Sequence, residues 1–260
     1  MSDTSNTKTV KNPTQASNKG FVVAAILVVL ALVGGLLAYV KFAPTQTDSA
    51  LSNFDKDDVN MTLTYEDGVV TLENNPKDNA KTISIYEDFS CSYCAKLAQQ
   101  DDESLKNAVE SGDIILKIRT MNFLDRGEIS NSTKVFAPAL AMAQEGDAEQ
   151  YWNYRKLNFF EFETVSGLIG EDAEFEDNVS SKLGFDAEYL GKARDEDALN
   201  EANAEAEKNI KSLEELAGEV SSPRVFWDEE EIDVQTPGWV EMIAQAPEST
   251  LSESQEAEQE

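Results

Sequence analysis

The sequence predicts an α/β fold with a helical insertion, preceded by one N-terminal transmembrane helix. A strand-like run at 82–86, a helical pattern that begins at Cys91 and a second strand-like run at 114–119 follow one another, which is typical of a βαβ unit with parallel strands. Residues 131–217 then carry helical patterns with no strand signal of comparable quality. An uninterrupted apolar stretch near the N-terminus predicts the transmembrane helix.

The apolar stretch runs from Phe21 to Val40 and contains no charged side chain. It has the length of roughly 20 residues that a helix needs to cross a bilayer, and residues 41–44 offer no convincing cleavage site. We therefore expect an uncleaved anchor in the lipid bilayer rather than a cleaved signal peptide or a buried helix. Three lysines precede the stretch and only Lys41 follows closely, which predicts a single-pass protein of the cell membrane with a cytoplasmic N-terminus and an extracytoplasmic domain.

The composition is strongly acidic, with 50 Asp and Glu residues against 21 Lys and Arg residues and a formal net charge of -29. Nucleic-acid binding needs a basic surface that neutralises phosphates, so this class of function is excluded. The excess charge favours solubility outside the cell, and a preference for basic client proteins is the alternative interpretation.

Changes in composition divide the chain into parts. The predicted parts are a cytoplasmic tail at 1–19, the transmembrane anchor at 20–42, a polar linker at 43–59, a compact domain at 60–246 with a helical insertion at about 131–217, and an acidic disordered tail at 247–260.

Alternation and helical spacing predict the remaining elements of the compact domain. A hairpin is expected from strands at 61–65 and 69–72, joined by a turn at 66–68. The insertion is expected to contain helices at 135–145, 150–162, 172–183 and 196–216, with the aromatic residues of the second helix in the core. A strand at 220–227 that contains a proline, a partner strand at 232–234 and a final helix at 239–246 complete the prediction.

The two cysteines of the chain form the motif Cys91-Ser92-Tyr93-Cys94 directly after the 82–86 strand. At the start of a helix, unpaired backbone N–H groups and the helix dipole stabilise a thiolate, so Cys91 is the predicted nucleophile. Cys94 lies one turn further and can then attack the mixed disulfide and release the partner. This spacing predicts a carrier of disulfides.

Two other interpretations of the cysteine pair are weaker. A zinc ion needs about four ligands, and the chain has two cysteines and no histidine, so no metal site is expected. A purely structural disulfide between Cys91 and Cys94 would close a very short loop and add little stability. We therefore expect no cofactor apart from the redox-active disulfide Cys91–Cys94.

The stretch 87–94, Glu-Asp-Phe-Ser-Cys-Ser-Tyr-Cys, and the order of the elements resemble the DsbA-like thiol-disulfide oxidoreductases of the thioredoxin superfamily, especially the membrane-anchored actinobacterial type. The resemblance covers residues 60–246 and implies a thioredoxin fold with a helical insertion. It also implies that Cys91 is the attacking thiol and Cys94 the buried resolving thiol. Ser92 and Tyr93 are the residues that would tune them.

The resemblance extends to the substrate-binding side of the site. It implies a cis bond before Pro223 that faces the disulfide, and pairing of the Ser222 backbone with an extended client chain; from the residues alone, a trans proline at a strand edge fits equally well. Asp88 is the nearest candidate to move a proton from Cys94, with a solvated turn residue or helix cap as the alternative.

The motif departs from the best-known member of the family in three ways. That member has proline and histidine between its cysteines, whereas this chain has Ser92 and no histidine, so the pKa of Cys91 is expected to be less depressed and the reduction potential lower. Ser92 can still cap the helix. Many relatives carry a glutamate at the position of Ile85.

The predicted function is oxidation of cysteine pairs in exported client proteins through a mixed disulfide on Cys91. Turnover then needs a membrane redox partner that reoxidises the pair. The alternatives are a reductase or isomerase of the same fold, a non-catalytic peptide-binding or chaperone-like module, and a scaffold whose acidic tail recruits a basic partner.

Overall fold

The computed structural model describes residues 46–247. The predicted cytoplasmic tail, the predicted anchor from Phe21 to Val40 and residues 248–260 lie outside the described part of the chain. Within residues 46–247, no helix is both long enough and apolar enough to cross a membrane.

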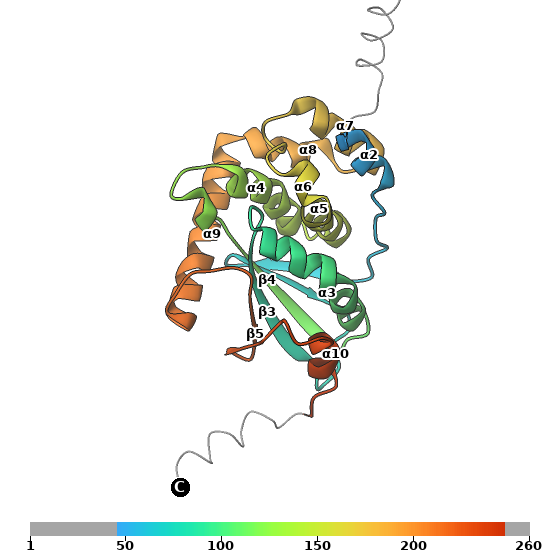
Figure 1. Ribbon diagram of the computed structural model, residues 1–260, viewed down its shortest axis with the longest axis vertical. Helices are drawn as coiled ribbons and strands as arrows, with labels where there is room; N and C mark the ends of the chain where they lie inside the picture. The colour runs from blue at the N-terminus through green and yellow to red at the C-terminus, as the bar shows by residue number, and fades with distance from the viewer. Residues whose placement is uncertain (1–45, 248–260) are drawn as a thin grey trace, which may run out of the picture. The chain divides into compact units, whose positions relative to one another are not determined.

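A six-stranded sheet forms the centre of the domain, in the order β1-β2-β4-β3-β5-β6 (Figure 1). Its strands are β1 (Thr62–Glu66), β2 (Val69–Glu73), β3 (Lys81–Asp88), β4 (Ile114–Met121), β5 (Arg224–Trp227) and β6 (Glu230–Glu231). β3 and β4 are parallel, and the other neighbouring strands are antiparallel. This confirms the predicted βαβ unit and the hairpin of β1 and β2. It also brings the carboxyl ends of β3 and β4 to the same edge of the sheet.

Helices cover the two faces of the sheet differently. α3 (Ser92–Glu110) and α10 (Trp239–Ala244) pack against each other, whereas α9 (Glu196–Ala217) packs against β4. Because side chains alternate along a strand, Ile85 joins the core that includes residues of α3, and Tyr86 joins a smaller cluster with Leu213 of α9. The sheet therefore lies between α3 and α9.

The helical insertion is confirmed, and Figure 1 shows it beyond one end of the sheet. Besides α9 it contains α4 (Asn131–Gln144), α5 (Ala148–Phe160), α6 (Phe162–Val165), α7 (Ala173–Leu183) and α8 (Ala187–Gly191). α5 packs against α3, and α4 packs against α9, so the insertion is continuous with the core of the sheet. The aromatic side chains of α5 are buried, as predicted; they are Tyr151, Trp152, Tyr154 and Phe159.

The predicted linker at 43–59 is wrong over part of its length. Residues Gln46–Asn53 form the helix α2, which packs against α6 and α7. Leu51 is buried to 1% exposure and Ala50 is also buried. A helix this short is not stable on its own, so its stability comes from packing against distant residues that a local pattern does not reveal. The domain therefore begins before residue 60.

The predicted partner strand at 232–234 is also displaced, because pairing begins earlier, at Glu230–Glu231. Asp228 and Glu229 both have positive φ angles, 48° and 72°, which form a two-residue turn directly after β5. Such turns favour Asn and Gly, and neither occurs here. The sequence therefore gives no signal for a two-residue turn here, and the partner strand is predicted two residues too late.

Candidate active site

The two cysteines lie where β3 leads into α3. Cys91 is the N-cap of α3 with an extended backbone, its N–H donates to the carbonyl of Asp88 at 2.9 Å, and its own carbonyl accepts from the N–H of Ala95 at 3.1 Å. The proposed capping role of Ser92 is wrong, because Ser92 is the first helical residue and its side chain is exposed. The turn therefore presents Cys91 to the unpaired N–H groups of the first helical turn.

The cysteines differ in exposure from the residues between them. Cys91 is 7% exposed and Cys94 is 2% exposed, and both are free thiols. Tyr93 is 66% exposed, and the ammonium group of Lys96 lies 4.8 Å from the centre of its ring. The pair is thus nearly enclosed, while Ser92 and Tyr93 form the surface beside it.

Ser222 and Pro223 reach the cysteines from a distant part of the sequence. The Ser222–Pro223 peptide bond is cis. The thiol of Cys91 donates to the carbonyl oxygen of Ser222 at 3.4 Å. The structure thus brings together the cysteines and both residues that the sequence suggested for client binding.

Hydrogen bonds separate the acidities of the two thiols. Donation from the Cys94 thiol is the largest cause that lowers the pKa of Cys91 to about 5; Ser222 and nearby backbone N–H groups act in the same direction, and burial opposes them. Burial and the neighbouring Cys91 raise the pKa of Cys94 well above its ordinary value. These donors lower the pKa of Cys91 strongly although the chain has no histidine, so the prediction of a less depressed pKa is wrong.

Asp88 lies beside the active-site turn but is not the solvated residue that the sequence suggested. It is fully buried, and its carboxylate accepts from the N–H of Ser90 at 2.8 Å, the hydroxyl of Ser132 at 2.6 Å and the N–H of Leu124 at 3.1 Å. Burial raises the pKa of Asp88 to about 6, against the effect of these hydrogen bonds. Asp88 therefore fixes the turn before Cys91 to α4. A role in proton transfer from Cys94 stays a prediction.

A second aspartate extends this connection and was missed in the sequence. Asp125, at the end of the 3-10 turn η1 (Phe123–Asp125), accepts hydrogen bonds from the backbone N–H groups of Ser130, Ser132 and Thr133 at the start of α4. The hydroxyl of Ser132 also donates to that of Ser90 at 2.8 Å. The available signal was the run of capping residues at 130–133, which marks a helix start.

The sequence analysis also missed a buried cluster of charges formed by Glu87, Asp102 and Arg155. The guanidinium of Arg155 donates to the carboxylate of Glu87 at 2.7 Å and to that of Asp102 at 2.6 Å. Burial raises the pKa of Asp102 to about 6, and Arg155 opposes the shift. The cluster joins β3, α3 and α5 just before the cysteine motif. Because Glu87 and Asp88 are neighbours in a strand, they face opposite sides of the sheet.

Replacing Asp88 by asparagine is expected to lower the free energy of unfolding by about 1–3 kcal/mol. The amide nitrogen of asparagine cannot accept a hydrogen bond, so at least one N–H or O–H group that now donates to the carboxylate would lose its acceptor. Unfolding in urea measures this, with Asp78→Asn in an exposed loop as the control. Equal losses for the two variants would contradict the role of Asp88.

The same variant tests the pH dependence. With a folded-state pKa of about 6 against the ordinary 3.8, Asp88 keeps a proton in the native state that the unfolded state releases. Its contribution to stability should therefore fall as pH rises from about 4 to about 6. This part of the pH dependence should be missing in Asp88→Asn.

These features define a thiol-disulfide oxidoreductase with a thioredoxin fold: a cysteine pair at a helix N-terminus, a low pKa for the first thiol, and the carbonyl before a cis proline against its sulfur. The thioredoxin family model matches residues 76–245. The chain therefore belongs to the thioredoxin superfamily and is a DsbA-like protein disulfide oxidoreductase. Among curated proteins, no sequence match was found.

Solved structures agree with this assignment. The MdbA thiol-disulfide oxidoreductase from Corynebacterium diphtheriae is 42% identical over 74% of this chain and 98% of its own, with a TM-score of 0.67. The protein of the same name from Corynebacterium matruchotii is 34% identical over 76% of this chain and 98% of its own, also with a TM-score of 0.67. MdbA from Actinomyces oris is 16% identical over 70% of this chain and 89% of its own, with a TM-score of 0.55, and supports the fold alone.

Proposed function

We propose that this protein is a membrane-tethered, extracytoplasmic oxidase that donates its Cys91–Cys94 disulfide to exported proteins. The observation that carries the proposal is the set of hydrogen bonds that the Cys94 thiol, the Ser222 side chain and nearby backbone N–H groups donate to the sulfur of Cys91, because they stabilise its thiolate. Stabilising the thiolate stabilises the reduced form, which makes the disulfide a stronger oxidant. Electrons then flow from the client to the enzyme.

The reaction consists of two thiol-disulfide exchanges. A client thiolate attacks the sulfur of Cys91, a client–Cys91 disulfide forms, and Cys94 leaves as a thiolate. A second client thiolate attacks the client sulfur of this mixed disulfide, and Cys91 leaves. The client loses two electrons and two protons, and the enzyme becomes a dithiol. The low pKa of Cys91 makes it a good leaving group in the second exchange.

The surroundings of Cys91 support contact with an extended client chain. Ser222 presents its backbone beside the sulfur, and Pro223 follows through a cis bond. Tyr93, inside the motif, is exposed. In the proposed complex the client backbone pairs with Ser222, while Ser92 and Tyr93 contact its side chains. A membrane redox partner reoxidises the dithiol, because residues 46–247 contain no further cysteine.

The reduction potential tests the direction of electron flow. Equilibration of the protein with reduced and oxidised glutathione should give a value of about -120 to -180 mV, in the range of oxidants and isomerases. A value below about -250 mV would place the protein with the reductases and overturn the oxidase proposal.

Alkylation should show the separated acidities of the thiols. In the reduced protein, the rate of Cys91 modification by iodoacetamide is expected to follow a titration with a midpoint near pH 5, while Cys94 stays unmodified. Cys94→Ala should move the midpoint upward, because it removes the largest cause of the low pKa. A midpoint near the ordinary pKa of 9.0 in the unmodified chain would contradict the proposed mechanism.

The membrane tether is proposed from the sequence from Phe21 to Val40 and its flanking lysines. The full chain should stay with membranes after washing with alkaline carbonate, and a membrane-impermeant thiol reagent should label Cys91 in intact cells. Release by carbonate would refute the tether, and labelling only after lysis would refute the extracytoplasmic location.

A further inference from the structure

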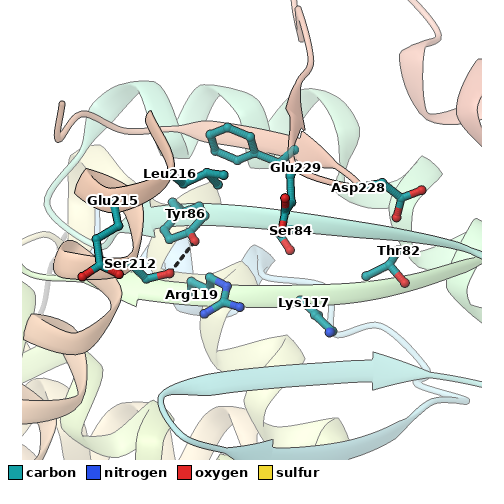
Figure 2. A pocket seen from close by; sticks show the side chains of 11 residues that line it. Thr82, Ser84, Tyr86, Lys117, Arg119, Ser212, Glu215, Leu216, Asp228 and Glu229 are labelled. Atoms are coloured by element: carbon teal, nitrogen blue, oxygen red, sulfur yellow. Dashed lines mark hydrogen bonds between the residues drawn. The ribbon is translucent and has the colours of Figure 1, made fainter. Parts of the chain in front are cut away.

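The sheet face on the side of α9 contains a hollow that the active site does not use. It has a volume of about 700 Å³ and lies over β3, β4 and β5, between α9 and the turn after β5 (Figure 2). Neither the two cysteines nor Pro223 line it. It is therefore a separate feature of the domain.

Two cations of β4 form one side of the hollow. Lys117 and Arg119 are two positions apart in the strand, so both side chains lie on the same face, where Figure 2 shows them side by side. Neither forms an ion pair with any residue in the described part of the chain, although acidic residues outnumber basic ones by 50 to 21. The hollow thus offers two positive charges without an ion pair in residues 46–247, although the carboxylate of Glu215 also lines it.

The buried part of Arg119 gives a second, independent sign of a missing partner. Its Nε is buried and donates no hydrogen bond to any atom of residues 46–247. Its guanidinium lies 5.5 Å from the ring centre of Tyr86, whose hydroxyl is already paired with that of Ser212 at 3.0 Å. Buried N–H groups in proteins are normally paired. Because the Nε itself is closed to solvent, an acceptor from outside the chain would meet the remaining part of the guanidinium, which lines the hollow.

The opposite side of the hollow is acidic. Asp228 and Glu229, in the exposed turn after β5, lie across from the two cations in Figure 2. β3 separates β4 from β5, and the register places Lys117 two positions and Arg119 four positions away from Asp228 along the strands, so the backbone of Asp228 is roughly 12 Å from that of Lys117 and roughly 16 Å from that of Arg119. This arrangement suits a ligand with a negative and a positive end. It disfavours a ligand with several negative charges.

The centre of the hollow carries both hydroxyl groups and apolar surface. Thr82 and Ser84 of β3 provide hydroxyls, and Leu216 of α9 is 37% exposed. The two hydroxyl groups can form hydrogen bonds with the peptide groups of a bound chain, and Leu216 can contact a small side chain of that chain. An extended chain spans about 3.3–3.6 Å per residue, so three residues cover roughly 10 Å.

We propose that this hollow binds a short peptide with free ends, with its carboxylate between Lys117 and Arg119 and its ammonium group against the turn formed by Asp228 and Glu229. Charge complementarity at both ends and the distance across the strands select this ligand. The site goes beyond disulfide exchange and does not depend on the proposed direction of electron flow.

Calorimetric titration of the full chain with trialanine tests the proposal. We expect saturable binding that weakens about tenfold when the C-terminus of the peptide is amidated or its N-terminus acetylated, as for the loss of one hydrogen bond to a charged group. Arg119→Gln should weaken binding of the free peptide by at least as much, and amidation should then have little further effect.

Further variants keep the test decisive. If Arg119→Gln does not fold, Lys117→Gln alone should still weaken binding about tenfold. Lys56→Gln removes an equal charge from an exposed position that does not line the hollow and should leave the affinity unchanged. Absence of saturable binding, or equal affinities for the free and amidated peptides, would overturn the proposal.

Two other probes examine different occupants. Inorganic phosphate should bind more weakly than trialanine, and an N-acetylated peptide of residues 248–260, which has five glutamates, should not displace trialanine. Tighter binding of phosphate would instead identify a simple anion site. Displacement by the acidic peptide would identify a site for the chain's own C-terminal segment, and either result would overturn the proposal.

Discussion

Replacing Cys91 by serine is expected to lower the rate of disulfide transfer to a reduced test protein by at least about three orders of magnitude. The hydroxyl group cannot form the mixed disulfide, so both exchanges are lost. The assay follows the loss of free thiols in the test protein with the oxidised enzyme in excess. Cys94→Ser should also stop turnover, but for a different reason: it has no Cys91–Cys94 disulfide to donate, although its Cys91 thiolate can still attack the disulfide of an oxidised test protein and form a mixed disulfide that no second thiol of the enzyme resolves.

The two variants are therefore distinguished by their products. Mixed with the test protein in its disulfide form, Cys94→Ser should accumulate a covalent adduct as one thiol of the test protein is released, visible by mass spectrometry and removed by reductant, whereas Cys91→Ser should form none. Ser181→Ala, at an exposed position of α7 outside the active site, is the control and should retain turnover. An adduct on Cys94 in the Cys91→Ser variant would show that the roles of the two thiols are reversed.

Replacing Arg155 by methionine should lower the free energy of unfolding by about 3–5 kcal/mol, because it leaves Glu87 and Asp102 buried without their cation. The side chains of all three residues are at most 4% exposed. Removing Arg155 also removes the charge that opposes the raised pKa of Asp102. In the variant, Asp102 then holds its proton more tightly in the native state than in the unfolded state. The loss of stability should therefore be larger at pH 7 than at pH 4.

Urea unfolding at both pH values measures this effect. Lys211→Met, which disrupts an exposed ion pair, should change stability by less than about 0.5 kcal/mol. A triple variant that combines Arg155→Met with Glu87→Met and Asp102→Leu should recover much of the loss, because it removes all buried charges together. If Arg155→Met is no less stable than Lys211→Met, the cluster does not stabilise the fold.

Local patterns predicted the centre of the domain correctly. Alternation identified β1 and β2, and the sequence around Cys91 identified the strand, the helix start and the nucleophile, because these features depend on residues within a few positions of one another. The partnership of Cys91 with Ser222 required the resemblance to a known family, since the two residues are 131 positions apart.

Contacts between distant segments account for what the sequence did not reveal. α2 is held by packing against the insertion, and Arg155 meets Glu87 across 68 positions of sequence. Charged residues in helices are usually exposed, so nothing in the local sequence of α5 indicates that Arg155 is buried. Asp88 was assigned to solvent for the same reason, although its hydrogen-bond donors come from three separate elements.

The exposure of Ser92 and Tyr93 has a consequence for how this enzyme can diversify. The residues that hold the active-site turn, Glu87 and Asp88, are buried and anchored on both faces of the sheet, whereas the two residues between the cysteines face solvent. Substitutions at these two positions can alter the environment of the thiolate without removing a core contact. Descendants of this sequence could therefore explore a range of oxidising strengths while inheriting the same folded scaffold.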